Sequence, residues 1–422
     1  MIVKSFVLRK ETAGRIAAAC TDGSVIVVRP EKKLEALFRD VVRRALVDKC
    51  PLEDDFAQIK SYYEDLSDDP AFRASVSSTL SSLSSYLSEG MFIQATLSSI
   101  EDYVLVKCAR LCAEAVNVAV NGTLIDGTGL MICRQHGSHT VVDWALSRKE
   151  IASRCTGEGK LVVSGGFGRM ESGYVVRIGR GGAYLMTTLI ASAIEAKRVE
   201  FYVEDNGIAG EVAMTYDEAA HYCACDASPI PSAALWPVKA AGIPVLILNI
   251  MDPDFPGTMI TSFGANDGRT ISGVIVDRNL ELLTIYGTGL LGQVGLSSAV
   301  FSAMSSAGIN VRFISQSSSE YSISIAVRSE DAPAAAEEIG RRVSGTGDYD
   351  DVMLLRRSVG IVTVYGDRMK NVSGTSGKVY GALGAEGISV VAAAQGGEEL
   401  SISIVVDEKD VNKAAKVLES LR

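Results

Sequence analysis

The chain has 422 residues and a formal net charge of −10, with 47% hydrophobic and 22% charged residues. Its length predicts about two to four domains, and its apolar content excludes a largely disordered chain. The acidic balance argues against general binding to nucleic acids or anionic membranes, because no basic surplus is available to neutralise phosphates. No apolar run approaches the roughly 20 residues of a membrane-spanning helix, so none is expected.

The first 270 residues alternate between strand and helix patterns. Strands are predicted at 2–8, 24–30, 116–122, 141–146, 160–168, 198–205 and 242–250. Apolar residues at helical spacing predict helices at 33–48, 55–65, 74–88 (Ser-rich and amphipathic), 100–115 and 183–196. Strands that alternate with helices are typical of a mainly parallel sheet covered on both faces. The predicted class is therefore an α/β three-layer sandwich.

Residues 359–406 repeat the pattern of residues 283–327. Each copy has an apolar strand, a glycine-containing loop, a helix (301–311 or 379–390), a turn and an alternating strand that ends at 327 or 406. Self-similarity on this scale indicates two copies of one supersecondary unit. The order of elements is typical of the ferredoxin-like βαββαβ plan. A tandem pair of such units beside an enzyme-sized region indicates an attached sensor.

The eight cysteines are scattered, which is typical of reduced thiols in a cytosol and predicts a cytoplasmic protein. His221, Cys223 and Cys225 have the residue types of a metal site, but tetrahedral zinc takes four ligands, usually at wider spacing. We therefore favour buried thiols beside a helix and expect no metal. Cys108 and Cys112 lie one helical turn apart, where core packing is the favoured interpretation.

Several segments together resemble the aspartokinase branch of the amino-acid kinase family. IGRGGAYLMTTLIASAI (178–194) resembles that family's LGRGGSDYTAALLAAAL, and AAGIPVLILNIMDPDFPGTMI (240–260) resembles KAGIPVRVKNTFNPENPGTLI. The two repeats resemble the family's tandem ACT domains, most closely at 289–320. The resemblance implies an amino-acid-kinase-like domain at 1–270, a first ACT domain at 271–350 and a second at 351–422.

The segments that hold ATP in that family are altered here. The family's KFGGTS is matched by residues 4–8, KSFVL, which keep the lysine and lose the glycines that let backbone N–H groups approach phosphates. Ala183 and Tyr184 stand where GRGGSD has serine and aspartate, and the nucleotide-wrapping TDVDGIYTADPR continues only over 203–208. Phosphoryl transfer depends mainly on positioning and charge neutralisation. These losses together predict an eroded ATP site.

The resemblance also implies the roles of individual residues. Lys4 matches the phosphate lysine, Arg180 the arginine that grips the substrate carboxylate, and Asp102 or Glu101 the acid that holds the substrate amine. The other implied substrate-binding positions are Ser99, Gly166, Phe167, Gly179, Gly181 and Gly182. Plainer interpretations stay open: a strand-end lysine with its ammonium in water, a surface arginine in a turn, and carboxylates that complement a helix dipole.

For the repeats, the resemblance implies that ACT domains dock side by side and bind an amino-acid effector between them. The positions that would line the first such site are Gly289, Gln293, Val294, Asn310, Ile314 and Gln316. The alternative is that the ACT domains serve only for dimerisation. In either case we expect a homodimer or a larger oligomer, because an exposed sheet edge is usually covered by pairing.

The function expected from these observations is that of an aspartokinase-family protein of amino-acid biosynthesis. It would sense an amino acid through its ACT domains, have low or no kinase activity alone, and act beside a partner kinase subunit. Two enzymatic alternatives stay open. One is a divergent aspartate kinase that uses ATP and Mg²⁺ to phosphorylate L-aspartate; the other is a related small-carboxylate kinase whose pocket Ala183 and Tyr184 have reshaped.

Overall fold

The computed structural model describes residues 1–89, 96–136, 139–179, 181–204, 213–224, 228, 230–265, 267–287, 295–317, 321–344 and 353–422. The chain divides into two compact units, unit 1 (Met1–Ala265) and unit 2 (Asn266–Arg422). Among the helices that these residues form, none has the length and hydropathy needed to cross a bilayer.

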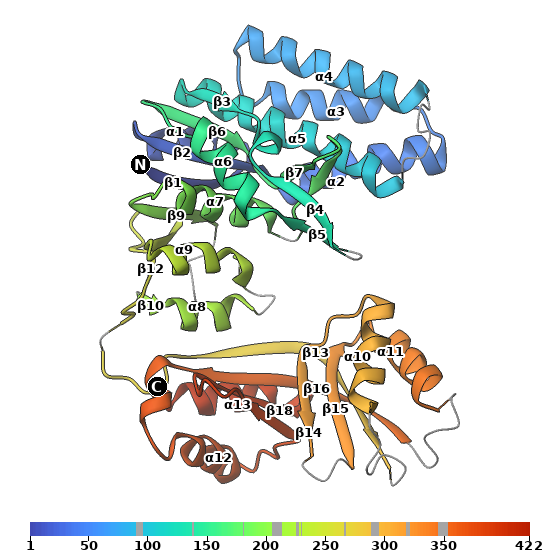
Figure 1. Ribbon diagram of the computed structural model, residues 1–422, viewed down its shortest axis with the longest axis vertical. Helices are drawn as coiled ribbons and strands as arrows, with labels where there is room; N and C mark the ends of the chain where they lie inside the picture. The colour runs from blue at the N-terminus through green and yellow to red at the C-terminus, as the bar shows by residue number, and fades with distance from the viewer. Residues whose placement is uncertain are drawn as a thin grey trace. The chain divides into compact units, whose positions relative to one another are not determined.

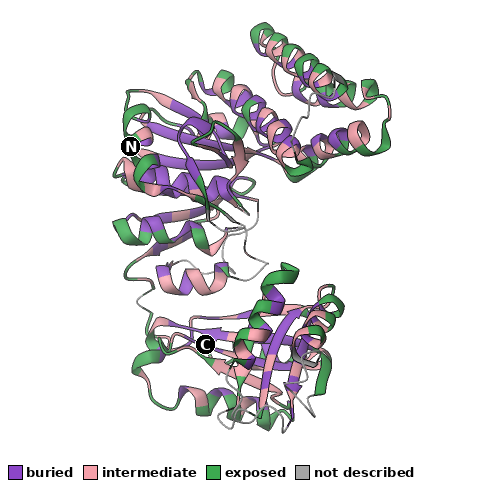
Figure 2. Ribbon diagram, turned by 45° about the vertical axis from the view of Figure 1, so that its right-hand side comes forward, coloured by how far each residue is buried: buried purple, intermediate pink, exposed green. Residues whose placement is uncertain are grey.

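An eight-stranded sheet forms the centre of unit 1 (Figure 1). In spatial order its strands are β10 (Ala213–Thr215), β12 (Thr258–Thr261), β11 (Val245–Asn249), β9 (Arg198–Val203), β1 (Ile2–Leu8), β2 (Ser24–Pro30), β6 (Lys160–Ser164) and β3 (Thr123–Ile125). Neighbouring strands run parallel except for β11 and β12. The central strands are buried on both faces, as a covered parallel sheet requires (Figure 2). The predicted α/β class is confirmed.

Helices cover both faces of this sheet. One face is covered by α1 (Ala13–Ala19), α2 (Lys32–Arg43), which continues as the π-helical turn η1 (Arg44–Asp48), and α5 (Leu97–Val120), with α3 (Glu53–Glu64) and α4 (Pro70–Glu89) packed beyond them. The other side carries α6 (Trp144–Arg154), α7 (Gly182–Ala193) and α9 (Trp236–Ala241), and α8 (Tyr216–Cys223) contacts β10 and β12. A second sheet has the order β5 (His139–Val142), β4 (Ile132–His136), β7 (Phe167–Met170) and β8 (Val175–Arg177). The strand predicted at 141–146 belongs to β5 only up to Val142 and is wrong beyond it, because Asp143 caps the start of α6.

The predicted strand at 116–122 is wrong, because α5 continues to Val120. Its alternating valines suggested a two-residue period. Val116 and Val120, four residues apart, lie on the buried face of the helix, whereas Val118 is 40% exposed. The helix ends at Asn121, whose left-handed backbone provides the cap.

Unit 2 is built on a six-stranded antiparallel sheet with helices packed on it. In spatial order the strands are β14 (Phe313–Gln316), β15 (Ser322–Arg328), β13 (Gly273–Tyr286), β16 (Met353–Tyr365), β18 (Ser401–Asp407) and β17 (Ala392–Gln395). The helices are α10 (Leu296–Ala307), α11 (Ala332–Ile339), α12 (Thr375–Ala385) and α13 (Val411–Glu419). α10 and α12 both begin and end before the predicted limits, and Gly308 ends α10 by taking a left-handed conformation.

Each repeat has its own core, and the two cores are built alike. Leu283, Val300 and Ile325 belong to the first, and Val362, Val379 and Ile404 hold the matching places in the second. Two polar contacts also recur between matching strands: the hydroxyls of Thr284 and Ser324 lie 2.9 Å apart, as do those of Thr363 and Ser403. The predicted ferredoxin-like repeat is confirmed.

Two long strands belong to both repeats. The first part of β13, Gly273–Asp277, pairs with residues 361–365 of β16, and its second part, from Leu280 on, pairs with residues 353–359. A register shift between Asp277 and Leu280 separates the two parts. The fourth strand of the second repeat therefore comes from the chain that precedes the first repeat.

Candidate functional site

The carboxyl ends of β1, β2 and β9 form the candidate site of unit 1. β1 pairs in parallel with β2 on one side and with β9 on the other. The chain leads from β1 to β2 but from β9 to the strands on the opposite side of the sheet, so the strand order reverses between β1 and β9. In open α/β sheets, ligands bind outside the carboxyl ends of the strands at such a switch point. The segments that follow the three strands begin with Arg9, Glu31 and Glu204.

The pocket at the switch point, the edge pocket, has a volume of about 320 Å³. Its lining residues are Arg9, Lys10, Glu11, Thr12, Glu31, Lys33, Tyr62, Glu204 and Met251. Cationic and anionic side chains are equally numerous in this lining. The edge pocket therefore has no net positive charge to offer to a phosphate.

Ion pairs hold several of these charged groups together. Arg9 Nε lies 2.6 Å from Glu204 Oε1 and 3.5 Å from Glu31 Oε2. The Tyr62 hydroxyl donates a 2.7 Å hydrogen bond to Glu31, and burial together with Glu31 raises the pKa of Tyr62. Lys10 pairs with Asp65 outside the pocket. The Arg9 guanidinium is thus shared between two carboxylates.

Lys4 does not reach this pocket, because it lies in the middle of β1, in register with Ile26 on β2 and Glu200 on β9. Its Nζ lies 2.8 Å from Glu200 Oε2 and donates a 2.7 Å hydrogen bond to the Ala19 carbonyl, and the side chain is only 6% exposed. The position and partners of Lys4 favour a structural role over phosphate binding.

Glu200 is held by further donors beside Lys4. Arg198 Nε donates to its carboxylate at 2.6 Å and the Tyr202 hydroxyl at 3.0 Å. Burial acts to raise the pKa of Glu200, but the hydrogen bond and charge of Lys4, with the other two donors, outweigh it, so the net pKa lies below its ordinary value. The carboxylate therefore stays ionised inside the sheet.

The glycine turn before α7 forms as the sequence predicts. Gly181 is the N-cap with φ of +76°, and the amide of Ile178 donates a 3.0 Å hydrogen bond to Gly166. A Cβ added to Gly182 would lie 2.8 Å from Ile178 Cβ and 3.1 Å from the Gly166 carbonyl oxygen. The glycines at 181 and 182 thus allow close packing of the chain on itself, Gly166 takes a left-handed φ of +97°, and Gly179 faces open space. Arg180 lies outside the described residues.

The first turns of α5 meet the end of β8 through Arg177, a residue that the sequence reasoning missed. The Arg177 amide donates a 3.0 Å hydrogen bond to Asp102 Oδ2, and its Nε lies 3.4 Å from Oδ1. The same guanidinium lies over the ring of Phe167, 6.0 Å from its centroid. Arg177 therefore contacts both Asp102 and Phe167. Ser99, in contrast, bonds locally: its hydroxyl donates a hydrogen bond to the Thr96 carbonyl. Glu101 is half-buried beside them.

Tyr184 and Arg29 form a second contact that was not predicted. Arg29, near the end of β2, donates a 2.6 Å hydrogen bond from Nη2 to the Tyr184 hydroxyl, and Tyr184 packs edge-on against Phe201. Burial raises the pKa of Tyr184, and Arg29 partly offsets this rise. A buried phenol thus stands at the position where the resembling motif carries aspartate.

Only part of the predicted effector site can be placed. Gly289, Gln293 and Val294 lie outside the described residues. Asn310, just before β14, and Ile314, within β14, are both exposed. The Ser297 hydroxyl lies 3.5 Å from Gln316 Oε1, and Ser376 lies 3.4 Å from Gln395 Oε1 at the matching place of the second repeat. Each repeat therefore joins the start of its first helix to its edge strand in the same way.

The other predicted side chains behave as core residues where they are described. Cys108 and Cys112 are buried against Tyr63, whose hydroxyl donates a 3.1 Å hydrogen bond to the Cys108 carbonyl. Cys223 is buried at the end of α8, and Cys225 lies outside the described residues. Within the described ranges, no three potential metal ligands gather in one place.

The sequence of the chain is similar to one family profile and to several characterised proteins. A profile of the ACT domain family matches residues 283–342 and 362–421. The bifunctional aspartokinase/homoserine dehydrogenase of Haemophilus influenzae is 28% identical over 343 residues, covering 77% of this chain and 41% of the relative. The chloroplastic bifunctional aspartokinase/homoserine dehydrogenase 1 of Arabidopsis thaliana is 31% identical over 215 residues, covering 49% and 24%. The matched part of the chain thus spans less than half the length of these curated relatives.

Solved structures give the same fold over the whole chain. Aspartate kinase from Clostridium acetobutylicum aligns with a TM-score of 0.78 at 19% identity, covering 100% of this chain and 99% of its own. E. coli aspartokinase III, in complex with lysine and aspartate, aligns with the same TM-score at 16% identity and the same coverage. These alignments show the aspartate kinase fold over the whole chain, the ACT matches show two ACT domains, and the sequence relatives show similarity to aspartokinases.

Proposed function

We propose that this chain is an aspartokinase-family protein with an eroded nucleotide site, which senses an amino acid through its ACT domains and has low or no kinase activity alone. The observation that carries the proposal is the position of Arg9 between Glu31 and Glu204 at the carboxyl ends of β2 and β9. The implied partner is a separate, active kinase subunit.

Charge supports the loss of nucleotide binding. Phosphoryl transfer relies on cations and oriented donors that neutralise the transferred phosphoryl group. In the edge pocket, Glu31 and Glu204 share Arg9, and a triphosphate would have to displace them or approach them as like charges. Lys4, the only lysine that the family motif offers in β1, is bound to Glu200 instead.

The residues expected to bind the substrate also support an eroded site. Asp102, one of the two acids proposed to hold a substrate amine, is bound by Arg177 through both its amide and its guanidinium. Tyr184, which replaces the family's aspartate, is buried and bound by Arg29. Both groups are satisfied by the protein itself, so neither needs a substrate to complete its interactions.

Retention of the ACT pair supports the sensing role. Both repeats keep complete cores and the same contact between helix and edge strand. Because E. coli aspartokinase III was solved with lysine bound, lysine is the first effector to test. A ligand that favours the folded form raises the melting temperature, so a titration of amino acids against melting temperature tests the proposal. Light scattering on the same samples tests the proposed homodimer or larger oligomer.

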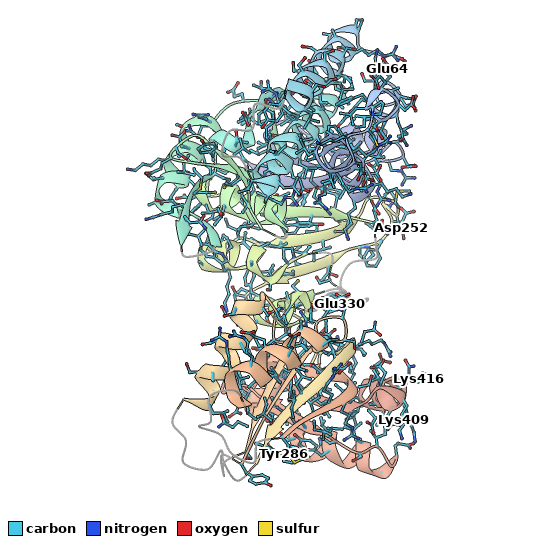
Figure 3. The ribbon with its side chains drawn as sticks, turned by 90° about the vertical axis from the view of Figure 1, so that its right-hand side faces the viewer. Glu64, Asp252, Tyr286, Glu330, Lys409 and Lys416 are labelled. Carbon is cyan, nitrogen blue, oxygen red and sulfur yellow. The ribbon has the colours of Figure 1, made fainter. Side chains whose placement is uncertain are left out.

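Calorimetry with MgATP tests the eroded site. We expect no saturable heat with the wild-type chain. The E31Q/E204Q variant removes both carboxylates that compete for Arg9, and we expect it to gain measurable binding. E171Q/E330Q removes two exposed carboxylates elsewhere and is the matched control; Glu330 is labelled in Figure 3.

A divergent aspartate kinase, or a related small-carboxylate kinase, is the second candidate. It is favoured by one observation: the edge pocket keeps Arg9, Lys10 and Lys33 at the switch point where ligands of this fold class bind. Saturable MgATP binding by the wild-type chain, with coupled turnover of L-aspartate or another small carboxylate, would establish this candidate and overturn the first.

A further inference from the structure

We propose that a basic pocket in unit 2, at the start of α12, binds a small phosphate monoester. This α12 pocket has a volume of about 380 Å³. Its lining residues are Asp267, Gly268, Arg269, Thr270, Ile271, Thr375, Lys378, Leu421 and Arg422. Two segments contribute most of them: the strap 267–271, which leads into β13, and the first turn of α12.

Positive charge exceeds negative charge around this pocket. Asp267 is the carboxylate among the lining side chains, and Arg269 Nε donates to it at 2.6 Å. The cationic side chains of the lining are Arg269, Lys378 and Arg422. A fourth cation, Arg368, lies close by, since its Nη1 would be 3.6 Å from a Cβ on Gly268. Neither Lys378 nor Arg368 forms an ion pair with any residue that the structure describes. In a chain with a net charge of −10, such a local excess of cations points to an anionic ligand.

The backbone adds hydrogen-bond donors to this charge. α12 has eleven residues and starts after Gly374, whose φ is +85°, and no side chain caps its first amides. The Thr375 hydroxyl donates to the Val372 carbonyl at 2.8 Å and so does not compete for those amides. Amides at a helix N-terminus beside basic side chains are a favourable combination for phosphate oxygens.

Size and apolar lining distinguish a monoester from inorganic phosphate. Small-molecule sites usually have volumes of about 300–1,000 Å³, so this pocket has room for a carbon skeleton beside a phosphate group. Ile271 is buried in the core of the second repeat, and Leu421 packs against that core, so both give the pocket an apolar side. The phosphate would meet Lys378 and the helix amides while the carbon skeleton covers the apolar side.

Binding there would connect the strap to α12. The strap forms the start of unit 2 in the chain, and β13, which follows it, pairs with β16 in both repeats. A ligand that contacts both the strap and α12 would hold Gly268 and Arg269 against the second repeat. The α12 pocket is separate from the positions near Ser297 and Gln316, where the first repeat would hold an amino acid.

The test is titration of the full chain with glycerol 3-phosphate, with glycerol and inorganic phosphate as comparison probes, followed by calorimetry. We expect saturable binding of glycerol 3-phosphate, none of glycerol, and weaker binding of inorganic phosphate. Lys378→Ala should weaken glycerol 3-phosphate binding about tenfold and Lys378→Glu more. Lys416→Ala is the matched control, because Lys416 is exposed on α13 outside the pocket (Figure 3).

Hydrogen exchange gives a second readout that does not depend on a variant. Glycerol 3-phosphate should slow exchange in the peptide that covers 267–271 and at the start of α12. Absence of saturable binding to the wild-type chain overturns the proposal, and so does equal affinity in Lys378→Ala, Lys378→Glu and wild type. Inorganic phosphate that binds as tightly as glycerol 3-phosphate overturns the assignment to a monoester.

Discussion

The edge pocket of unit 1 and the α12 pocket of unit 2 are similar in size but differ in how their cations are used. In the edge pocket, Arg9 is shared between Glu204 and Glu31, so its charge is neutralised by the protein. In the α12 pocket, Lys378 has no such partner among the described side chains, and the carboxylate nearby is bound to Arg269. Counting basic residues therefore does not identify an anion site; the carboxylates that face them decide whether an anion is bound.

The largest effect should come from Lys4, a buried cation of unit 1 that forms an ion pair with the buried Glu200. Of the donors that the structure describes around the buried Glu200, Lys4→Met leaves Arg198 and Tyr202, and we expect the free energy of unfolding to fall by about 3 kcal/mol. Urea denaturation measures the change. Lys10→Met is the control, because Lys10 pairs with Asp65 at the surface and should change stability by less than about 0.5 kcal/mol. A small effect in both variants would contradict a structural role for Lys4.

The second effect is the pH dependence that Glu200 produces. Its pKa in the folded state lies below the ordinary value of 4.5, so it binds fewer protons when folded than when unfolded. Its stabilising contribution is present above that ordinary value and is lost as the pH falls through the folded pKa. In Lys4→Met the folded pKa should rise, so the corresponding loss should begin at a higher pH. Urea midpoints measured between about pH 7 and pH 3 in both proteins check this; coincident pH profiles would contradict it.

A smaller effect is expected at Arg9, whose side chain is 40% exposed. Arg9→Met removes the counter-ion of Glu31 and Glu204 and should reduce the free energy of unfolding by about 0.5–1 kcal/mol, less at high salt. Lys33→Met is the matched control: Lys33 lines the same pocket without an ion pair to any described side chain, so we expect almost no change. Equal losses in the two variants would show that the pairing of Arg9 contributes little.

The smallest effect should be that of Lys378→Ala on stability in the absence of ligand. Lys378 is exposed and makes no ion pair with the described residues, so we expect a change within about 0.5 kcal/mol. Thermal unfolding of wild type and variant measures it. A clear loss of stability would place Lys378 among the cations that hold the fold and remove the contrast with Lys4.

The sequence was sufficient for the fold class and for the repeat, because both depend on periodic apolar positions. Val300 and Val379 are spaced alike in the two copies and occupy matching places in the two cores. It was misleading at residues 116–122, where alternation and helical spacing coincide over a few valines. In such short stretches, the helix that precedes them decides the outcome.

The candidate site was harder to predict, because charges separated in sequence meet only in the folded chain. Lys4 matched a motif lysine, yet its partner Glu200 comes from a strand almost two hundred residues further along the chain (Figure 1). Arg177 and Arg29 carried no motif signal, and their partners Asp102 and Tyr184 lie on other elements. A motif names residue types, whereas the pairing of each charge depends on strand order and register.

The sharing of β13 and β16 by both repeats has a practical consequence for dissecting the molecule. A fragment that begins at Leu283 would contain the whole matched length of both ACT domains, yet it would lack Gly273–Asp277. Residues 361–365 would then become an unprotected sheet edge, which favours self-association. An isolated sensor that stays monodisperse should therefore start upstream of Ile271, and neither ACT domain can be excised alone with its sheet intact.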